Sequence, residues 1–154
     1  MSSMSERFIA RNKKAYHDFE ILEDFEAGLV LQGTEVKSLR EHRVTLKESY
    51  ARIKGGEVWL EGCHINPYSH GNISNHEPVR PRKLLLHKRE IRRLLAKVME
   101  KGWTLVPLSL YFSKGKVKVR IALARGKQSH DKREAKKRRM VDREIQAELK
   151  RRRQ

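Results

Sequence analysis

The chain has 154 residues and carries 36 Lys and Arg residues against 19 Asp and Glu residues, a formal net charge of +17. This length accommodates one domain with an extension and excludes two independent cores of ordinary size. No apolar run reaches the ~18 residues that a membrane-spanning helix requires, and the first residues hold no apolar stretch of signal-peptide length.

The charge and the cysteine usage narrow the class of protein further. A positive excess of this size predicts a polyanionic partner, with nucleic acid the first candidate and an anionic membrane surface the second. Cys63 is the one cysteine in the sequence. It excludes an internal disulfide framework and favours a reducing, cytoplasmic environment.

The first half of the chain predicts short strands and one short helix. Residues 19–24 and 28–31 are expected to form two strands joined by a turn at Glu26-Ala27-Gly28. A helix is predicted over 34–40, with Thr34 as its N-cap. Strands at 49–54 and 57–65 are predicted to flank a two-residue hairpin turn at Gly55-Gly56.

The second half contains the clearest helix signal. A long irregular loop is expected from 66 to 82, where Pro and Gly recur. Residues 88–101 are predicted to be helical and to stop at Gly102, because five apolar residues recur at helical spacing. These residues are Ile91, Leu94, Leu95, Val98 and Met99.

Three further strands are predicted at 103–106, 108–112 and 116–124, with the last turn at Lys114-Gly115. Residues 116–121 alternate strictly between basic and apolar, so one face of that strand is expected to be basic. Together these elements predict an all-β fold with added helices, namely a small antiparallel barrel of the oligonucleotide-binding type over residues 1–124.

Residues 125–154 are predicted to form a basic tail outside this barrel. They contain thirteen Lys and Arg residues and five Asp and Glu residues, a net charge of +8. The tail favours helix but lacks the apolar surface to fold alone, so we expect it to be disordered or marginally helical. Its apolar stripe, Val141, Ile145 and Leu149, is expected to be too narrow to dock firmly on a core. The simpler hypothesis is that this segment is a solvated basic extension that only adds affinity for the nucleic acid.

The sequence offers little for catalysis or metal binding. Cys63 beside His64 could suggest a thiol nucleophile, but adjacent strand residues point to opposite faces, so a buried structural cysteine is expected. His64, His70 and His76 lack the spacing of a zinc site, and loop hydration or RNA contact explains them better. His17, Asp18 and Glu20 resemble a nuclease acid–base set only loosely. We therefore expect no enzyme, no metal and no cofactor.

Nucleic-acid binding is better supported. Basic side chains occur on nearly every predicted element, and Tyr, Phe or His residues among them could stack on unpaired bases. The stacking candidates are His17, Phe19, Tyr68 and His87. The basic candidates are Arg11, Lys13, Lys14, Lys37, Arg40, Arg80, Arg82 and Lys83.

Several strings are specific enough to indicate a family. They include Asn12-Lys13-Lys14-Ala15-Tyr16-His17-Asp18-Phe19, Gly33-Thr34-Glu35-Val36-Lys37-Ser38-Leu39-Arg40, Arg82-Lys83-Leu84-Leu85-Leu86-His87-Lys88 and His130-Asp131-Lys132-Arg133-Glu134. They follow one another in the same order as in the SmpB family of bacterial SsrA-binding proteins, which they closely resemble, and the resemblance covers essentially the whole chain. Gln128 follows Lys127 where many members have a second lysine, which puts one phosphate contact in doubt.

The resemblance implies an RNA-binding factor of trans-translation, the rescue of stalled ribosomes. The barrel of such a protein, expected to be a monomer, binds the tRNA-like domain of transfer-messenger RNA and delivers it to the ribosome, where small-subunit RNA is the main contact. The tail then enters the decoding centre and the empty messenger channel. A structural ribosomal or ribosome-assembly protein is the alternative.

The resemblance also implies site residues. Asn12, Glu26 and Leu85 match family positions linked to RNA binding, and His17 belongs to the same N-terminal motif. His130, Asp131 and Lys132 match a tail motif required for accommodation. The further ribosome-binding candidates are the basic residues of the tail, namely Lys127, Arg133, Lys136, Lys137, Arg138, Arg139 and Arg143.

Overall fold

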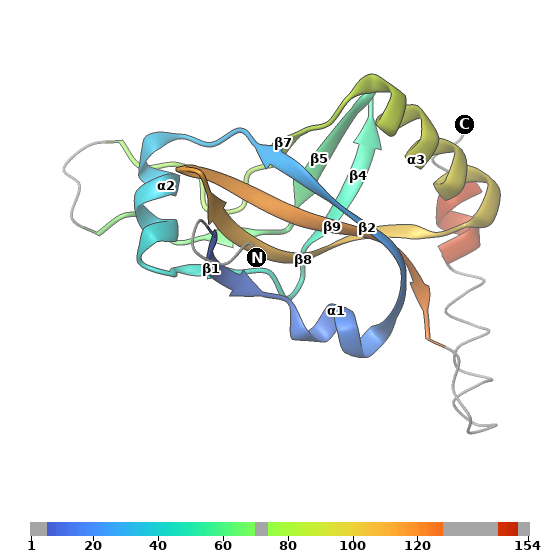
Figure 1. The fold of residues 1–154 in the computed structure, drawn as a ribbon, viewed down its shortest axis with the longest axis horizontal. Helices are drawn as coiled ribbons and strands as arrows, with labels where there is room; N and C mark the ends of the chain where they lie inside the picture. The colour runs from blue at the N-terminus through green and yellow to red at the C-terminus, as the bar shows by residue number, and fades with distance from the viewer. Residues whose placement is uncertain (1–5, 70–73, 128–144, 151–154) are drawn as a thin grey trace.

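The computed structural model describes residues 6–69, 74–127 and 145–150 (Figure 1). Its strands are β1 (Glu6–Arg11), β2 (Phe19–Leu29), β3 (Val44–Thr45), β4 (Tyr50–Lys54), β5 (Glu57–Glu61), β6 (His64–Ile65), β7 (Arg82–Leu85), β8 (Thr104–Ser113) and β9 (Lys116–Gly126). Its helices are α1 (Lys13–Asp18), α2 (Gly33–Arg40) and α3 (Lys88–Lys101), and residues 145–150 add one further helical turn and a half.

The main sheet closes into a barrel. Its strand order is β1-β8-β4-β5-β7-β2-β9, and β8 pairs a second time with β9. Among the described residues, the ring that results has six strands, and every neighbouring pair is antiparallel, as an even number of strands permits. The predicted antiparallel barrel is confirmed.

Strand β8 carries three partners, which explains how β1 joins the barrel. One edge of β8 pairs with β9 along its length. Its other edge pairs with β4 near Leu105 and with β1 from Ser109 onward. The interior is filled by the inward side chains of these strands together with α3, and Leu60, Leu84, Leu110, Ile121 and Leu123 are essentially inaccessible to solvent.

The turn predicted at 26–28 is wrong, because β2 runs unbroken from Phe19 to Leu29. Its pairing with β9 continues through Glu26, Ala27 and Gly28. The only irregularity in that pairing is a shift between Ile21 and Glu23. Gly28 therefore serves a close approach between strands and not a turn.

The two predicted strands at 103–112 are likewise one strand. β8 passes through Pro107, which pairs with Ile121, and the register then shifts between Pro107 and Ser109, so that Leu108 is an extra residue in the ladder. Both two-residue hairpins are confirmed. Gly55 and Gly56 join β4 to β5 and both have positive φ, as do Lys114 and Gly115 between β8 and β9.

The two helices predicted in the barrel, α2 and α3, agree with prediction except at one cap. α3 spans the predicted 88–101 and ends at Gly102 in the left-handed conformation (φ 70°). α2 begins one residue early, and its N-cap is Gln32 and not Thr34. The reason is Glu35, whose Oε1 accepts a hydrogen bond from the Gln32 amide at 2.7 Å.

The sequence reading missed β1 and α1 altogether. Asn12 explains the junction between them, since it is only 4% exposed and caps α1 by accepting a hydrogen bond from the Ala15 amide at 3.2 Å. Its Nδ2 donates to the carbonyls of Pro107 (3.0 Å) and Leu46 (3.3 Å). Asn12 thus fastens the N-terminal segment to the barrel.

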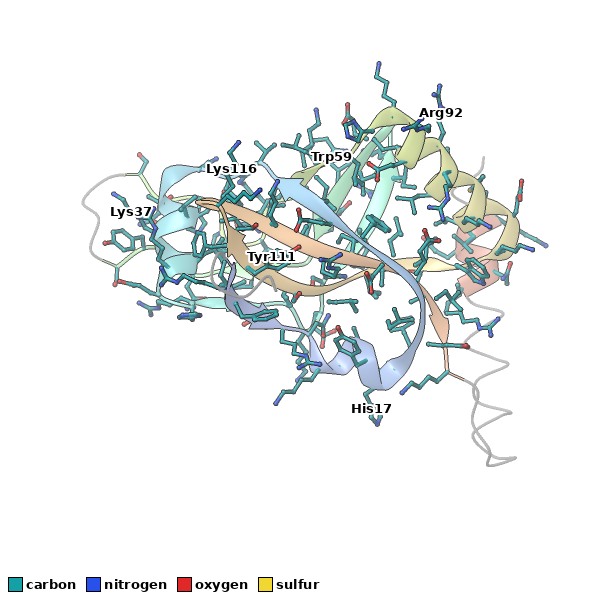
Figure 2. All side chains as sticks on the ribbon, in the orientation of Figure 1. His17, Lys37, Trp59, Arg92, Tyr111 and Lys116 are labelled. Atoms are coloured by element: carbon teal, nitrogen blue, oxygen red, sulfur yellow. The ribbon has the colours of Figure 1, made fainter. Side chains whose placement is uncertain are left out.

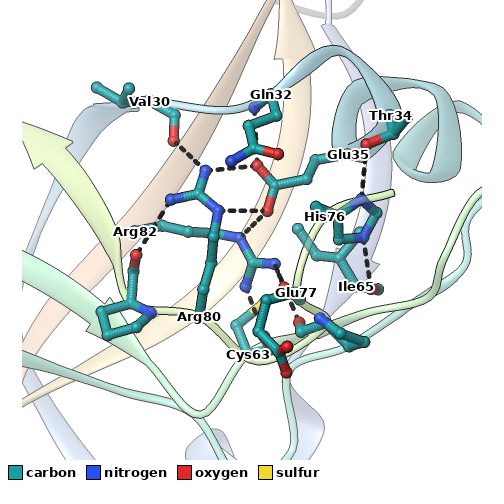
Figure 3. A network of polar contacts seen from close by, with 12 residues as sticks. Val30, Gln32, Thr34, Glu35, Cys63, Ile65, His76, Glu77, Arg80 and Arg82 are labelled. Carbon is teal, nitrogen blue, oxygen red and sulfur yellow. Dashed lines mark hydrogen bonds and ion pairs between the residues drawn. The ribbon is translucent and has the colours of Figure 1, made fainter. Parts of the chain in front are cut away.

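Arg82 is placed in the core, which corrects its predicted role as an RNA contact. Its side chain is completely buried and donates to Glu35 Oε2 at 2.5 Å and to the Cys63 carbonyl at 2.7 Å (Figure 3). The carbonyls of Glu77 and Pro78 accept its remaining contacts. Each of its three nitrogens donates inside the protein, and the side chain is inaccessible to solvent. Arg82 therefore holds the 66–82 loop to the barrel and is not available to contact RNA.

Glu35 sits between two guanidinium groups in this network. Arg80 also donates to it, from Nη2 at 2.6 Å and from Nε at 3.1 Å. Burial alone would raise the pKa of Glu35, but the hydrogen bonds from Arg80, the Gln32 amide and Arg82 outweigh it, so the pKa lies below its ordinary value. The carboxylate is therefore charged and fully paired.

The last strand of the barrel ends near the position predicted for it. β9 continues to Gly126, two residues past the expected end of the barrel, and the Lys127 amide donates to the Asp18 carbonyl at 3.1 Å.

In the part of the chain that the structure describes, no helix has both the length and the apolar character needed to cross a membrane.

Candidate nucleic-acid interface

A row of directly paired residues crosses five strands on the outward face of the barrel, with exposed ends and a covered tyrosine, Tyr111, which is 3% exposed. The strand registers pair Phe8 with Tyr111, Tyr111 with Lys118, Lys118 with Gly28, and Gly28 with Leu85. Residues that pair directly in antiparallel strands share one face. We refer to Phe8, Tyr111, Lys118, Gly28 and Leu85 as the outer row.

Both ends of the outer row are exposed and apolar. Phe8 is 66% exposed on β1, and Leu85 is 53% exposed on β7. Between them stands the cation of Lys118. An aromatic or apolar surface beside a cation can contact a base or ribose and neutralise the adjacent phosphate, so this arrangement suits nucleic acid.

Tyr111 organises the first half of the row (Figure 2). Its hydroxyl donates to Glu26 Oε2 at 2.5 Å, and the guanidinium of Arg120 lies 5.9 Å from its ring centroid. Its ring meets Phe8 edge to face, with centroids 6.2 Å apart. Because Glu26 pairs with Arg120 across the strands, an acid and a base flank the row side by side.

Gly28 determines how Leu85 is presented. A Cβ at position 28 would lie 3.2 Å from Leu85 Cβ and 3.3 Å from its Cδ1, which is tighter than ordinary contact. The bare backbone therefore gives Leu85 the room to lie across β2. Gly28 thus places no side chain between Leu85 and Lys118 in the row.

Two further predicted residues, Lys83 on β7 and His87 at the N-cap of α3, lie near this face. Lys83 pairs with Trp59 on β5, and its Nζ contacts Glu57 Oε2 at 3.3 Å. His87 is exposed at the N-terminus of α3, where its amide donates to Glu90 Oε1 at 3.1 Å. The structure thus brings Glu26, Lys83, Leu85 and His87 onto the β2–β7 side of the barrel.

Lys37 and Arg40 belong to a different region. Both are exposed on α2, and Lys37 lies 5.5 Å from the ring centroid of Tyr68. Arg40 lines a small hollow of about 180 Å³ with Arg7, Phe112 and Gly115, at the barrel end that carries the β8–β9 turn. Figure 2 shows Lys37 at this end of the molecule.

A third basic group surrounds α1. Lys13 and His17 are exposed there, and Lys14 Nζ contacts Glu48 Oε1 at 3.3 Å. Arg11 lies 5.0 Å from the ring centroid of Tyr16. Because the Lys127 amide bonds to Asp18, α1 lies at the point where the chain leaves the barrel, and Lys127 is exposed at that point.

The other predicted tail residues lie outside the described part of the chain. They are His130, Asp131, Lys132, Arg133, Lys136, Lys137, Arg138, Arg139 and Arg143.

The groups considered for catalysis are divided between the core and the surface around α1 and β2. Cys63 is fully buried, and burial raises the pKa of its thiol to about 11, so it is a poor nucleophile. His17 Nδ1 and Asp18 Oδ1 are 3.0 Å apart on α1, whereas Glu20 on β2 accepts from Arg125 at 2.7 Å. That hydrogen bond lowers the pKa of Glu20, which keeps the carboxylate ionised and unsuited to act as an acid.

The histidines of the 64–76 segment are structural where they are described. His76 is buried and bridges Thr34 Oγ1 (2.9 Å) and the Ile65 carbonyl (2.8 Å), so the suggested RNA contact is wrong for it. His64 Nδ1 lies 3.1 Å from Asn66 Oδ1. Within residues 6–69, 74–127 and 145–150, no three His, Cys, Asp or Glu side chains group as metal ligands.

Comparison with known proteins decides the family. The model for the SmpB protein family matches residues 9–151. The chain belongs to the SmpB family. The SsrA-binding protein of Syntrophobacter fumaroxidans is 63% identical over 96% of this chain and 92% of that protein. The SsrA-binding protein of Carboxydothermus hydrogenoformans is 58% identical over 94% and 97%.

A solved structure extends the likeness to three dimensions. It is described as "tmRNA-SmpB: a journey to the center of the bacterial ribosome" and is 53% identical in sequence. It aligns with a TM-score of 0.66 over 82% of this chain and 92% of its own. The resemblance of the sequence to the SmpB family is therefore confirmed in sequence and fold.

Sequence reasoning missed several residues of this SmpB-family barrel face. Phe8, Tyr111, Lys118 and Arg120 flank Glu26 and Leu85, but they come from strands far away in the chain. The alternation over 116–121 did signal a basic outward face on β9. It could not show that β2 and β8 lie on either side of it, because register depends on barrel closure.

Proposed function

We propose that this protein is an RNA-binding factor of trans-translation that binds the tRNA-like domain of transfer-messenger RNA and delivers it to stalled ribosomes. The observation that carries the proposal is the outer row. Its exposed ends, Phe8 and Leu85, and its central Lys118 form a surface suited to unpaired bases and phosphate. Family membership supports the choice of RNA.

Within this proposal the predicted RNA-binding residues take different roles. Glu26, Lys83, Leu85 and His87 would contact RNA directly from the β2–β7 side. Asn12 is buried, so it would act by holding β1, and with it Phe8, against β8. Lys13, His17, Lys37 and Arg40 lie elsewhere and would meet other RNA segments or the ribosome.

The tail would serve the ribosome. Starting at Lys127 beside α1, a basic segment of this length could enter the decoding centre and the messenger channel vacated on a stalled ribosome. Messenger RNA that still fills the channel would exclude it, since two polymers cannot occupy one volume. Small-subunit ribosomal RNA would then be the main partner of the tail.

Sequencing the RNA that co-purifies with the tagged protein tests the proposal. We expect transfer-messenger RNA to be enriched, with ribosomes present in less than equimolar amounts. Stoichiometric association with one ribosomal subunit and no enrichment of transfer-messenger RNA would instead establish a structural or assembly protein of the ribosome.

Glu26→Ala is expected to weaken binding of transfer-messenger RNA about tenfold, although it makes the protein more basic. The carboxylate accepts from Tyr111 and lies beside Arg120, so its loss releases both neighbours and removes an acceptor for base donors. Gel shift at fixed salt measures the affinity. Glu26→Gln, which keeps an acceptor oxygen, should lose less. Tighter binding by Glu26→Ala would show that only net charge matters.

A further inference from the structure

α3 carries more apolar side chains than the barrel core buries. Of its five predicted apolar residues, Ile91 and Leu94 are buried in the barrel. Leu95, Val98 and Met99 are only partly covered or exposed and face a groove of about 330 Å³. The groove also contains Ala51 and Ile53 of β4 together with Trp103 and Leu105.

Residues 145–150 lie at this groove, and Leu149 forms part of its wall. Residues 145–150 are helical, and Leu149 is 7% exposed while it lines the groove beside Leu95 and Val98. Gln146 crosses the end of α3, where its amide lies in the space that a side chain at Gly102 would fill. Figure 1 shows this helix in red beside α3.

This contact differs from the expectation that the stripe of the tail is too narrow to dock. One buried leucine is enough here because the groove supplies the apolar surface that the tail lacks. Ile145, one turn away on the same stripe, remains 36% exposed, so the contact rests on Leu149. A helix of six residues is far too short to be stable alone in water and needs such support.

We propose that the groove between α3 and β4 is an intramolecular docking site for residues 145–150, which holds the tail end on the barrel in the free protein. The chain that joins Lys127 to Ile145 is then tied to the body at both ends. The tail can therefore extend away from the barrel at full length only when Leu149 leaves the groove. That last consequence rests on the proposed function, whereas the docking contact does not.

Amide hydrogen exchange on the full-length protein, without RNA, tests the docking. We expect the amides of 145–150 to be protected in the wild type and to exchange about tenfold faster in Leu149→Ala. Ile145→Ala is the matched control, because it shortens an apolar side chain on the same stripe that is not buried, and it should change exchange less than about twofold. Equal effects of the two variants, or no protection in the wild type, would overturn the proposal.

A substitution on the groove side separates docking from local helix propensity. Met99→Ala removes groove surface without touching the tail and keeps α3 helical, so it should also speed exchange at 145–150. Unchanged exchange there would contradict the proposed contact. Protection that disappears on tenfold dilution would mean that the tail docks on a second copy, which overturns the intramolecular assignment. None of these outcomes depends on whether the protein binds transfer-messenger RNA.

Discussion

Glu35→Gln is expected to lower the free energy of unfolding by about 3–5 kcal/mol. The variant keeps the size of the side chain but removes the charge that neutralises Arg82, which is completely buried, and Arg80. A buried guanidinium without a counter-charge is costly, because its desolvation is no longer offset. Urea denaturation at pH 7 measures the change.

Glu57→Gln is the matched control for this measurement. It removes the same charge from an ion pair with Lys83, but both side chains are about 40% exposed. Water screens that pair, so we expect a change of less than about 1 kcal/mol. Similar losses in the two variants would show that the Glu35 network contributes no more than a surface pair does.

The pKa of Glu35 adds a pH dependence to this difference. Its pKa in the folded protein lies below the ordinary value, so the unfolded chain binds the proton more readily. The stabilisation is therefore complete above the unfolded pKa of about 4.3 and is lost as the pH falls through the lower folded value. The gap between the wild type and Glu35→Gln should be constant from pH 6 to 5 and should narrow below about pH 4.

The ion-pair network of Glu35, Arg80 and Arg82 could not be predicted from the sequence. The string that includes Glu35 was informative for the family, but nothing in it indicated that Glu35 is buried, and Arg82 was predicted to contact RNA. Glu35 and Arg82 are 47 residues apart in the sequence, and they meet because the 66–82 loop folds back toward α2. Nothing in the local pattern around Arg82 separates a buried guanidinium from an RNA contact.

Local patterns did predict the elements that depend on local physics. The apolar spacing over 88–101 predicted α3 with its Gly102 cap, and the glycine-containing turns at 55–56 and 114–115 predicted both hairpins. The errors at Gly28 and Pro107 share a cause. Each residue can end a strand, but pairing along β9 and a bulge accommodate both of them. Glu26 and Leu85 were predicted only through the resemblance to the SmpB family. The other residues of the outer row meet through strand pairing, which the sequence alone does not show.

Ala147→Pro is expected to reduce peptide tagging on stalled ribosomes about a hundredfold. Proline inside a helix removes an amide donor and clashes with the preceding turn, at a cost of about 3 kcal/mol. We expect the tail to become helical when it enters the messenger channel, because its composition favours helix, so this cost would fall on that step. Binding of transfer-messenger RNA should stay within twofold of the wild type, because position 147 is exposed and lies far along the chain from Glu26 and Leu85. A tagging assay on ribosomes stalled on truncated messenger RNA, run beside a gel shift, measures both.

Ala147→Ser separates the backbone effect from the side-chain change. Serine at this exposed position keeps the amide and costs the helix only a fraction of what proline does, so tagging should stay close to the wild type. Proline at 147 also loosens the docked state of residues 145–150, which by itself would free the tail and favour entry into the channel. Loss of tagging in spite of that release would therefore identify helix formation in the channel as the step that fails. A parallel loss of RNA affinity in the gel shift would instead contradict the division of roles between barrel and tail.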